Sequence, residues 1–365
     1  MSSIKKILLV NDTRGAQEYL YRAFIEMGLE CDLAYFGWSS IKPIDNMLNF
    51  DPLRKFGILS KPIRPILNII KLNGLDNYDV ASFVHRISFI DRPHLLKYLD
   101  LPIIRNKANV MSYTALGCDE LGFIANNDSL PYSPCNTCQL QDDIQGYCPK
   151  VVRPLFNTAK SNLNKYFDCV TSVGVEYSHL QNHFKKDVHP MPLPVDLGEI
   201  PWSPSSYSGN RKVKIIHTPS RSGFKGTTAI SKAIEILSSH RNDFEFSIIS
   251  GLSFNDYIKA VSEADVIIDQ VWSQSPGMNA LWLLGMGKIV LSGNTILAQE
   301  YMTEYKESPI IDASPIPHIL ANTISNVIDN KEQFKEQSER GISYLRKHHD
   351  YMKVADRYLK LWSNV

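Results

Sequence analysis

The stretch from Ile215 to Gly226 reads Ile-Ile-His-Thr-Pro-Ser-Arg-Ser-Gly-Phe-Lys-Gly. The apolar run Val213–Ile216 predicts a buried strand, and apolar residues at helical spacing predict a helix over Thr227–Ser239. Between them lies a loop of small residues that carries Arg221 and Lys225. Because a helix N-terminus presents unpaired N–H groups and a partial positive charge, this stretch predicts a site for an anion such as a diphosphate. The alternative is an ordinary strand-to-helix turn with solvated cations.

Size and composition place the chain among two-domain globular proteins. It has 365 residues, of which 44% are hydrophobic and 21% are charged. Lys and Arg number 39 against 38 Asp and Glu, so the net charge of +1 argues against a broad nucleic-acid-binding face. No apolar run approaches the ~18 residues of a membrane span, and the run Ile7–Val10 is too short for a signal peptide. We therefore expect a cytoplasmic protein whose six cysteines are thiols or metal ligands rather than disulfides.

The first half of the chain alternates strand and helix patterns. It opens with a strand that is apolar on both faces, as in parallel sheets, followed by a helix over Ala16–Met27 that ends at Gly28. The predicted strands are Ile4–Asn11, Cys31–Phe36, Tyr78–His85, Leu101–Arg105, Ala108–Tyr113, Phe167–Val173 and Val188–Leu193. Further helices are predicted over Asp91–Leu99, Val151–Lys165 and Val175–Phe184.

Residues 37–76 interrupt this alternation. The part from Leu53 to Leu72 interleaves apolar residues with Arg54, Lys55, Lys61, Arg64 and Lys71. We interpret it as a helical insert that packs on its own domain. A peripheral contact with the inner face of a membrane is the alternative, because basic amphipathic segments bind anionic surfaces.

Four of the six cysteines fall within residues 114–150: Cys118, Cys135, Cys138 and Cys148. Cys135 and Cys138 are separated by two residues, a spacing that lets both thiolates bind one metal ion. A long segment without helix or strand also needs something to order it, and a metal ion would do so. We therefore predict a structural zinc site formed by these four thiolates. Thiols without a metal, in an ordered loop, are the alternative.

Prolines and serines crowd residues 190–209, a composition typical of a linker. Beyond it the alternation resumes, with strands predicted over Val213–His217, Phe244–Ser250, Val266–Asp269, Lys288–Leu291 and Pro309–Ile311. Two such series predict two Rossmann-like, doubly wound parallel sheets of the α/β class, with a cleft between them. We place the domains at 1–195 and 196–348, and expect a last amphipathic helix over Tyr351–Trp362.

Polar or glycine-containing loops follow three strands of the second half. Ligands of doubly wound sheets bind beyond the carboxyl ends of the strands, so these loops are candidates for a nucleotide site. Gly277 precedes a helix, a geometry that also binds anions. The candidate residues beyond Arg221 and Lys225 are Gly226, Gly251, Gln270, Pro276, Gly277, Met278 and Asn279.

The sequence also resembles a known family. His217–Thr227, Asp265–Gln270 and Ala280–Val290 are similar to motifs of the GT-B glycosyltransferases, in particular the retaining enzymes of family 4. Pro192–Asp196 and Leu116–Asp119 are similar to shorter motifs of the same family. The resemblance implies a C-terminal domain that binds a nucleotide-sugar donor and an N-terminal domain that binds the acceptor. It also implies that residues 349–365 form a helix that packs back on the N-terminal domain.

The resemblance assigns roles to particular residues. By position, Arg221 and Lys225 hold the donor diphosphate and stabilise the leaving nucleotide without a catalytic metal. The chain contains no Asp-x-Asp motif, the usual metal ligand of the other large glycosyltransferase fold, which agrees with this expectation. His85 matches a strand-end histidine that faces the transferred sugar, with packing at the strand end as the alternative. Asp119 is a second candidate for a sugar or acceptor contact.

One position departs from the family pattern. The family has two glutamates separated by seven residues, and Gln274 and Trp282 occupy those positions here. A tryptophan cannot accept hydrogen bonds from ribose hydroxyls, but it can stack on a base or a sugar, or pack in the core. Trp282 is therefore a candidate donor contact of a different kind.

Together these features predict a retaining glycosyltransferase that moves a sugar from a nucleotide sugar to a glycan or lipid-linked acceptor. The resemblance implies a role in the biosynthesis of a surface polysaccharide such as O-antigen or capsule. The main alternative is a non-catalytic relative that binds nucleotides or glycans, or a subunit that needs a partner. A GT-B epimerase is a third hypothesis.

Overall fold

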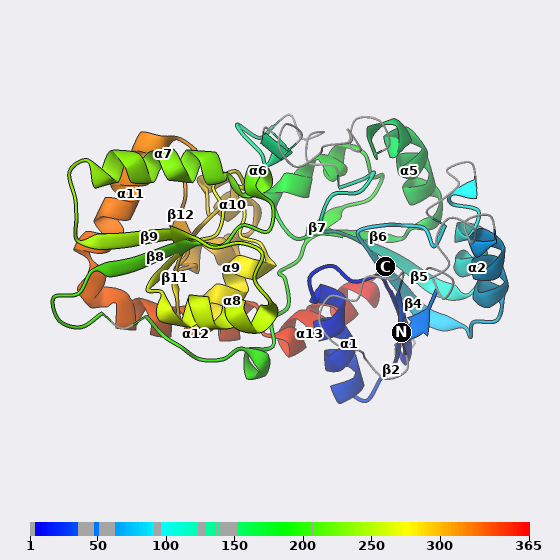
Figure 1. Ribbon diagram of the computed structural model, residues 1–365. Coiled ribbons are helices and arrows are strands. Elements are labelled where there is room, and N and C mark those ends of the chain that lie inside the picture. The colour runs from blue at the N-terminus through cyan, green and yellow to red at the C-terminus, as the bar shows by residue number, and fades with distance from the viewer. Residues whose placement is uncertain are drawn as a thin grey trace.

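The computed structural model contains two parallel β-sheets, each with helices on both faces (Figure 1). It describes residues 4–35, 47–50, 63–90, 96–122, 129–135, 137–138, 152–205 and 207–365. Cys148, much of the basic segment 53–72 and the start of the helix predicted over Asp91–Leu99 lie outside these residues. Within the described ranges, no helix is long and apolar enough to cross a membrane.

The first sheet consists of β1 (Lys6–Val10), β2 (Glu30–Tyr35), β3 (Leu48–Asn49), β4 (Tyr78–Val84), β5 (Ala108–Ala115), β6 (Cys169–Ser172) and β7 (Val188–Pro190). Neighbouring strands are parallel, and their spatial order is β3-β2-β1-β4-β5-β6-β7. The order reverses between β1 and β4, because the chain first winds outward on one side of β1 and then continues on the other. This topology confirms the doubly wound sheet predicted for the first half.

Two layers of helices cover this sheet. One face carries α1 (Ala16–Glu26) and α13 (Tyr351–Trp362), and the other carries α2 (Arg64–Asn73), α3 (Leu101–Arg105) and α5 (Arg153–Tyr166). Alternate residues of a strand point to opposite faces. Ile7 and Leu9 of β1 therefore pack with α1 and α13, whereas Leu8 and Val10 pack with the opposite layer.

The second sheet consists of β8 (Val213–His217), β9 (Phe244–Ile248), β10 (Val266–Ile268), β11 (Ile289–Ser292) and β12 (Ile311–Asp312). Its strands are also parallel, in the order β12-β11-β10-β8-β9. Figure 1 shows α7 (Thr227–Ser238) and α11 (Pro317–Asp329) on one face, and α8 (Phe254–Glu263), α9 (Met278–Gly285) and α12 (Phe334–His348) on the other. The shorter helices of this half are α6 (Ser222–Lys225), α10 (Ile296–Tyr301), η7 (Thr303–Glu307) and η8 (Lys331–Gln333). The 3₁₀ turn η6 (Leu197–Glu199) lies in the linker.

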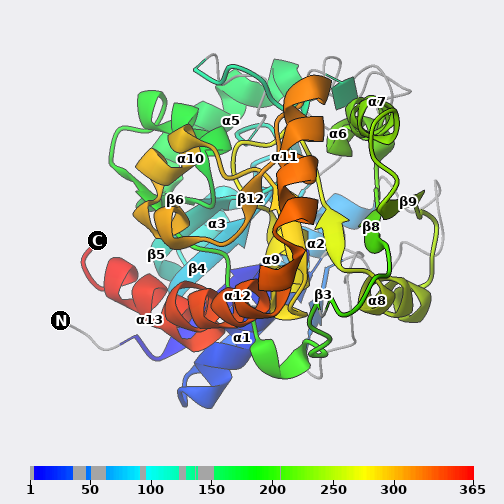
Figure 2. The same cartoon turned by 90° about the vertical axis from the view of Figure 1, so that its left-hand side faces the viewer.

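The chain crosses between the two halves twice, and the crossings run side by side. The N–H of Val195 donates to His349 O (2.7 Å), and the N–H of Tyr351 donates to Val195 O (3.1 Å). Beyond the second crossing, α13 packs along α1 (Figure 2). Its Trp362 is buried beside Phe24 of α1, with ring centres 5.7 Å apart. The helix expected to return to the first half is therefore confirmed.

Two local predictions are wrong, and a third differs only in the type of helix. Leu101–Arg105 is helix α3 rather than a strand, because β5 pairs directly with β4 and leaves no place between them. The helix predicted over Val175–Phe184 is present as the 3₁₀ helix η5 (Val175–Asn182), with N–H groups bonded three residues back, as Tyr177 bonds to Gly174 (3.1 Å). The predicted loop contains a single helical turn, α6, which ends with Lys225 itself.

Candidate functional site

The second sheet reverses its order between β8 and β10, which are hydrogen-bonded neighbours although β9 lies between them in sequence. Parallel sheets bind ligands beyond the carboxyl ends of their strands at such a reversal. Two segments lie there: residues 218–226 after β8, the β8 loop, and residues 269–277 after β10, the β10 loop. Between them they contain most of the residues predicted to bind a nucleotide.

Lys225 lies at this reversal as half of an ion pair. Its Nζ is 2.8 Å from Oδ1 of Asp269 and 3.3 Å from Oε1 of Gln270. Asp269 also accepts hydrogen bonds from Nδ2 of Asn279 (2.7 Å) and from the hydroxyl of Ser292 (3.1 Å). Burial would raise the pKa of Asp269, yet the Lys225 cation and these hydrogen bonds hold it below its usual value. The structure therefore places a cation, fixed by a buried carboxylate, at the reversal.

Asn279 joins this ion pair to the start of α9. Its Nδ2 donates to Asp269, and its Oδ1 accepts a hydrogen bond from the hydroxyl of Tyr257 (3.0 Å). Gly277 precedes the helix in an extended conformation, and no side chain caps the helix start. The first N–H groups of an uncapped helix are donors that an anion can use. Two buried residues flank this helix start, Pro276 and Met278.

Gly226 closes the β8 loop at a position that requires glycine. Its φ is +80°, and a Cβ there would lie 2.4 Å from Cγ2 of Val271 and 2.7 Å from Cδ1 of Trp272. Without a side chain at this point, the β8 loop packs directly on the β10 loop. That close approach brings Lys225 within reach of Asp269.

Arg221 is placed differently from Lys225, because it is exposed and stands at the junction of the two halves. Its guanidinium carbon lies 4.2 Å from the ring centre of Phe224. One guanidinium nitrogen lies 3.9 Å from Sγ of Cys138, which belongs to the first half of the chain. The two predicted phosphate-binding cations therefore lie on one loop, one held within the second half and one facing the first.

Three further candidates lie along the same edge of the sheet. Gln270 is buried with its side-chain oxygen toward Lys225, and Gly251 forms an exposed turn after β9 with φ +71°. Trp282 is half-buried on α9, edge-to-face with Phe254 at 5.9 Å between ring centres. Because Phe254 is 60% exposed, this pair presents an aromatic surface to solvent.

In the first half, His85 lies at the reversal of the sheet, directly after β4. Its φ is +70°, and Asn11, which follows the neighbouring β1, has φ +66°. Non-glycine residues rarely adopt this conformation, and when they do they often lie at functional sites. Gly117, after β5, lies so close that a Cβ there would be 3.1 Å from Nδ1 of His85. Strained turns therefore fix the backbone around His85.

Asp119 is buried and turned toward its own loop. Its carboxylate accepts hydrogen bonds from the hydroxyl of Tyr113 (2.9 Å), from the N–H of Leu121 (3.0 Å) and from the N–H of Gly122. Burial, together with the neighbouring Glu120 carboxylate, raises the pKa of Asp119 despite these hydrogen bonds. The hydrogen bonds of Asp119 therefore stabilise the turn that follows Gly117, and its carboxylate is directed toward this turn rather than toward a ligand.

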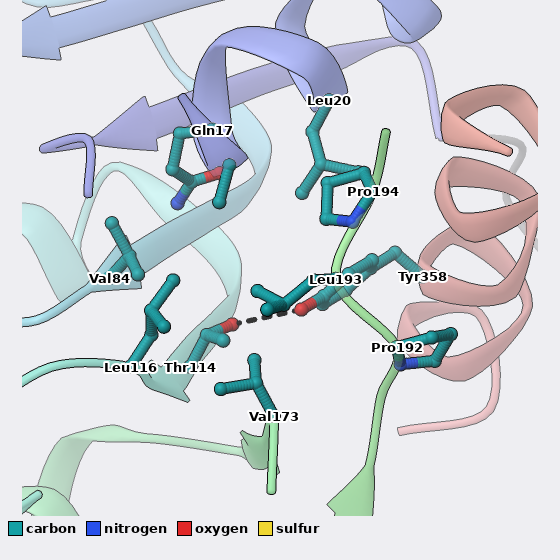
Figure 3. Close-up of a pocket in the computed structure, with 11 residues that line it drawn as sticks. Gln17, Leu20, Val84, Thr114, Leu116, Val173, Pro192, Leu193, Pro194 and Tyr358 are labelled. Carbon is teal, nitrogen blue, oxygen red and sulfur yellow. Dashed lines mark hydrogen bonds between the residues drawn. The ribbon is translucent and has the colours of Figure 1, made fainter. Parts of the chain in front are cut away.

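A pocket lies beside the reversal of the first sheet (Figure 3). Its cavity volume is about 10 Å³, which leaves room for about one water molecule. Gln17 lines it, and the Oε1 of this buried side chain has no hydrogen-bond partner among the described residues. The hydroxyls of Thr114 and Tyr358 lie 3.3 Å apart on the same wall. The remaining wall is mostly apolar, from Leu20, Val84, Leu116, Val173, Pro192, Leu193 and Pro194.

Loops from the carboxyl edges of the two sheets meet. The hydroxyl of Thr137 donates to Gly223 O in the second half (2.7 Å), and Nε2 of Gln274 donates to Tyr132 O in the first half (2.8 Å). The rings of Tyr132 and Trp272 are also packed edge-to-face, with centres 6.1 Å apart. The sites at the two reversals therefore face one another across the junction of the halves.

The predicted zinc site is not supported. Across the described part of the chain, no group of three or more His, Cys, Asp or Glu side chains could hold a metal ion. Cys135 and Cys138 lie in a short segment that contacts the second half, whereas Cys118 follows β5 beside Gly117. The two-residue spacing therefore belongs to a loop held by contacts with protein, and Cys148 lies outside the described residues.

Two further residues of this region are not among the predicted site residues. Asp269 directly follows a buried strand, which is a signal in the sequence, but its pairing with Lys225 joins residues 44 positions apart and has no local signal. Glu176 gave no signal at all, because its partners lie 97 to 99 residues away in the sequence.

Comparisons with known proteins agree with this architecture. No protein-family model matches the sequence, and no curated protein sequence matches it either. Among solved structures, the chain is similar to sucrose-phosphate synthase from Thermosynechococcus elongatus, with a TM-score of 0.62 at 12% identity, covering 99% of this chain and 98% of that one. It is also similar to Anabaena HepE in complex with UDP and glucose (TM-score 0.61, 13% identity, 99% and 100% coverage). A third is WaaG, a glycosyltransferase involved in lipopolysaccharide biosynthesis (TM-score 0.57, 12% identity, 99% and 100% coverage). The chain therefore has the GT-B fold over its full described length.

Proposed function

We propose that the protein is a retaining glycosyltransferase that moves a sugar from a nucleotide-sugar donor to a glycan or lipid-linked acceptor. The observation that carries the proposal is the Lys225–Asp269–Asn279 network at the reversal of the second sheet, opposite the carboxyl edge of the first. A fixed cation beside an uncapped helix start suits the diphosphate of such a donor. The complex of HepE with UDP-glucose supports this class of donor.

In this proposal, charge on the departing nucleotide is stabilised by the chain's own cations. When the bond between the sugar and the diphosphate breaks, negative charge develops on the leaving oxygen. Lys225, held in place by Asp269, and Arg221 from the same loop would stabilise that charge without having to reorganise. We propose that catalysis needs no metal ion, because this pair supplies the positive charge that a metal would otherwise bring.

We further propose a division of labour between the halves. Residues 196–348 bind the donor and residues 1–195 bind the acceptor, with 349–365 completing the first half. His85 would face the transferred sugar from its strained turn, and Asp119 would hold the turn that positions it. The other residues proposed to contact the donor are Gly226, Gly251, Gln270, Pro276, Gly277, Met278, Asn279 and Trp282. The role of WaaG supports an acceptor in surface polysaccharide biosynthesis.

Ligand-induced stabilisation tests the donor site first. A ligand that binds the folded state raises stability by RT ln(1 + [L]/Kd), so a thermal-shift screen against nucleotides and nucleotide sugars should identify the base and the sugar. Release of free nucleotide only when an acceptor is present would then establish transfer. An isomerised sugar would indicate an epimerase instead.

A non-catalytic nucleotide-binding relative is the second candidate, and Trp282 favours it. The family position that binds the ribose carries an indole packed against Phe254 here, which cannot accept a hydroxyl proton. A protein that binds nucleotide sugars tightly, but releases no nucleotide with any acceptor tested, would fit this candidate and not the transferase.

For a lipid-linked acceptor we also propose a peripheral membrane contact through 53–72. The described part of this segment shows Ile63, Ile66 and Ile70 exposed at 49%, 59% and 61% along one side of α2. The segment carries Lys and Arg but no Asp or Glu, which suits an anionic lipid surface. Replacement of Ile66 and Ile70 by Ser should lower binding to vesicles that contain anionic lipid. Unchanged binding, in that variant and after charge reversal of Arg54, Lys55, Lys61 and Arg64, would refute the contact.

A further inference from the structure

Glu176 belongs to the first half of the chain, yet its carboxylate is bound by the β10 loop of the second half. Its Oε1 accepts hydrogen bonds from the hydroxyl of Ser273 (2.6 Å), from the N–H of Gln274 (2.8 Å) and from the N–H of Ser275 (2.8 Å). Glu176 is 4% exposed, so water competes little for these donors. Charge-assisted hydrogen bonds in a buried setting are stronger than neutral ones. Three of them on one oxygen make a specific contact between the halves.

The backbone next to Glu176 fits the same loop closely. The N–H of Val175 donates to the hydroxyl of Ser275 (3.1 Å). A Cβ on Gly174 would lie 2.7 Å from Oε2 of Glu176 and 2.8 Å from Oγ of Ser275. The φ of Gly174 is −175°, an extended conformation that any residue adopts, so glycine is needed here for space. The turn at 174–176 is thus shaped to receive the β10 loop.

The bound part of the β10 loop leads straight into the proposed donor site. Ser275 is followed by the uncapped helix start at Gly277 and then by Asn279, which holds Asp269. The β10 loop makes a second contact with the first half, because Nε2 of Gln274 donates a hydrogen bond to Tyr132 O. The loop lacks helix or strand of its own between β10 and α9, so its order depends on these contacts with the first half.

We propose that Glu176 is a positioning residue that holds the β10 loop, and with it the first turn of α9, in the arrangement that binds the donor diphosphate. The inference rests on the proposed function and adds to it. Donor affinity would depend on a carboxylate supplied by the half that does not bind the donor. The donor site would be complete only when the two halves are docked through Glu176.

Three variants test the positioning role of Glu176, and a fourth variant in the same junction serves as the control. Glu176→Ala removes the carboxylate, Glu176→Gln keeps its shape without the charge, and Gly174→Ala displaces it sterically while leaving every polar group in place. Tyr305→Phe is the control, because the Tyr305 hydroxyl donates to Val173 O (3.1 Å) in this junction and makes no hydrogen bond to the β10 loop among the described residues.

The first readout is amide hydrogen exchange of the unliganded protein, which does not depend on activity. In Glu176→Ala and Gly174→Ala, peptides covering 273–279 should exchange about 10-fold faster or more, with a smaller change in Glu176→Gln. Exchange of these peptides in Tyr305→Phe should match the wild type. Unchanged exchange in all three variants, or equal acceleration in the control, would overturn the proposal.

The second readout is the dissociation constant for UDP-glucose, with formate added. Glu176→Ala should weaken binding about 10-fold, and high concentrations of formate should restore it by placing a carboxylate in the vacated site. Gly174→Ala should weaken binding without rescue, because no space is left for formate. Wild-type affinity in Glu176→Ala, or a loss that formate does not reverse, would overturn the positioning role. The wild type could bind no nucleotide sugar while Glu176→Ala still accelerates hydrogen exchange in 273–279. In that case the proposed function is wrong, but Glu176 still orders the β10 loop.

Discussion

Both sheets reverse their strand order, but the residues that lie at the two reversals differ in kind. In the second sheet the reversal carries a buried ion pair, with Asp269 bound by three side chains. In the first sheet it carries strained backbone at His85 and Asn11, and a mostly apolar pocket beside them. A polar network of fixed geometry that holds a cation suits an anionic ligand such as a diphosphate.

The largest effect should follow from breaking the ion pair. Lys225→Ala leaves the carboxylate of Asp269 buried without its cation, which should cost about 3 kcal/mol of unfolding free energy as well as donor binding. Urea unfolding and nucleotide titration of the same samples measure both effects. The double variant Lys225→Ala with Asp269→Asn should recover stability but not donor affinity. Wild-type stability in the single variant would show that the pair is not the fixed element of this site.

Replacement of Arg221 should affect donor binding but not stability, because Arg221 is exposed and lies outside the ion pair. Arg221→Ala should weaken donor binding by roughly 1.5–3 kcal/mol and leave the unfolding free energy almost unchanged. Lys232→Ala, which removes an exposed cation from α7, is the matched control for net charge. Donor affinity equal to that of this control would remove Arg221 from the site.

Acid should affect the two halves with opposite sign. Burial lowers the pKa of His217 to about 4, so below its unfolded value of about 6.5 the unfolded state takes up protons first and stability falls with pH. From pH 7 to pH 5 the second half should lose about 2 kcal/mol through His217. Burial raises the pKa of Asp100 to about 6 and that of Asp119 to about 7. Over the same range these two carboxyl groups should stabilise the first half by more than it loses through His349, whose pKa burial lowers to about 4.

Hydrogen exchange at each pH, corrected for intrinsic rates, can separate these contributions. Protection of β8 and β10 should fall relative to that of β4 and β5 as the pH is lowered. Burial also raises the pKa of Asp312 in the second half, which opposes the trend in part. His217→Gln should flatten the pH dependence of β8. If that variant keeps the wild-type slope, the imidazole is not its source.

The smallest effect is expected at the aromatic edge of the proposed donor site. Trp282→Ala should weaken the binding of a nucleotide by about 1 kcal/mol if the indole stacks on the base or the sugar. Affinity for inorganic pyrophosphate, which has no base, should stay the same. Equal losses for both ligands would mean that Trp282 only supports the packing of α9.

Local patterns predicted the framework of both halves and much less of what joins them. The limits of β8 and α13 agree with those expected, because each is a single buried pattern bounded by a turn. The strand predicted at Leu101–Arg105 is wrong because a short run whose apolar residues are Leu101, Ile103 and Ile104 fits either a strand or a helix. The direct pairing of β4 with β5 leaves it as a helix.

The candidate site shows the same limit. Arg221 and Lys225 could be named from one loop, but their different environments depend on Cys138 and Asp269, which are distant in sequence. The cysteine spacing suggested a metal because spacing alone cannot show that Thr137, beside Cys138, bonds to the second half instead. The hydrogen bonds between Glu176 and the β10 loop join segments about a hundred residues apart, so no local sequence pattern predicts them.

The return of α13 to the first half has a consequence for how the chain is made. Val354, Tyr358 and Trp362 fill the layer over Ile7 and Phe24, so the sheet synthesised first lacks part of its covering until the last segment has emerged. During translation its apolar surface stays uncovered while the whole second half is being produced. The first sheet is therefore synthesised before the second but completed after it. A chain truncated before α13 would expose an apolar surface to which chaperones or other incomplete chains could bind.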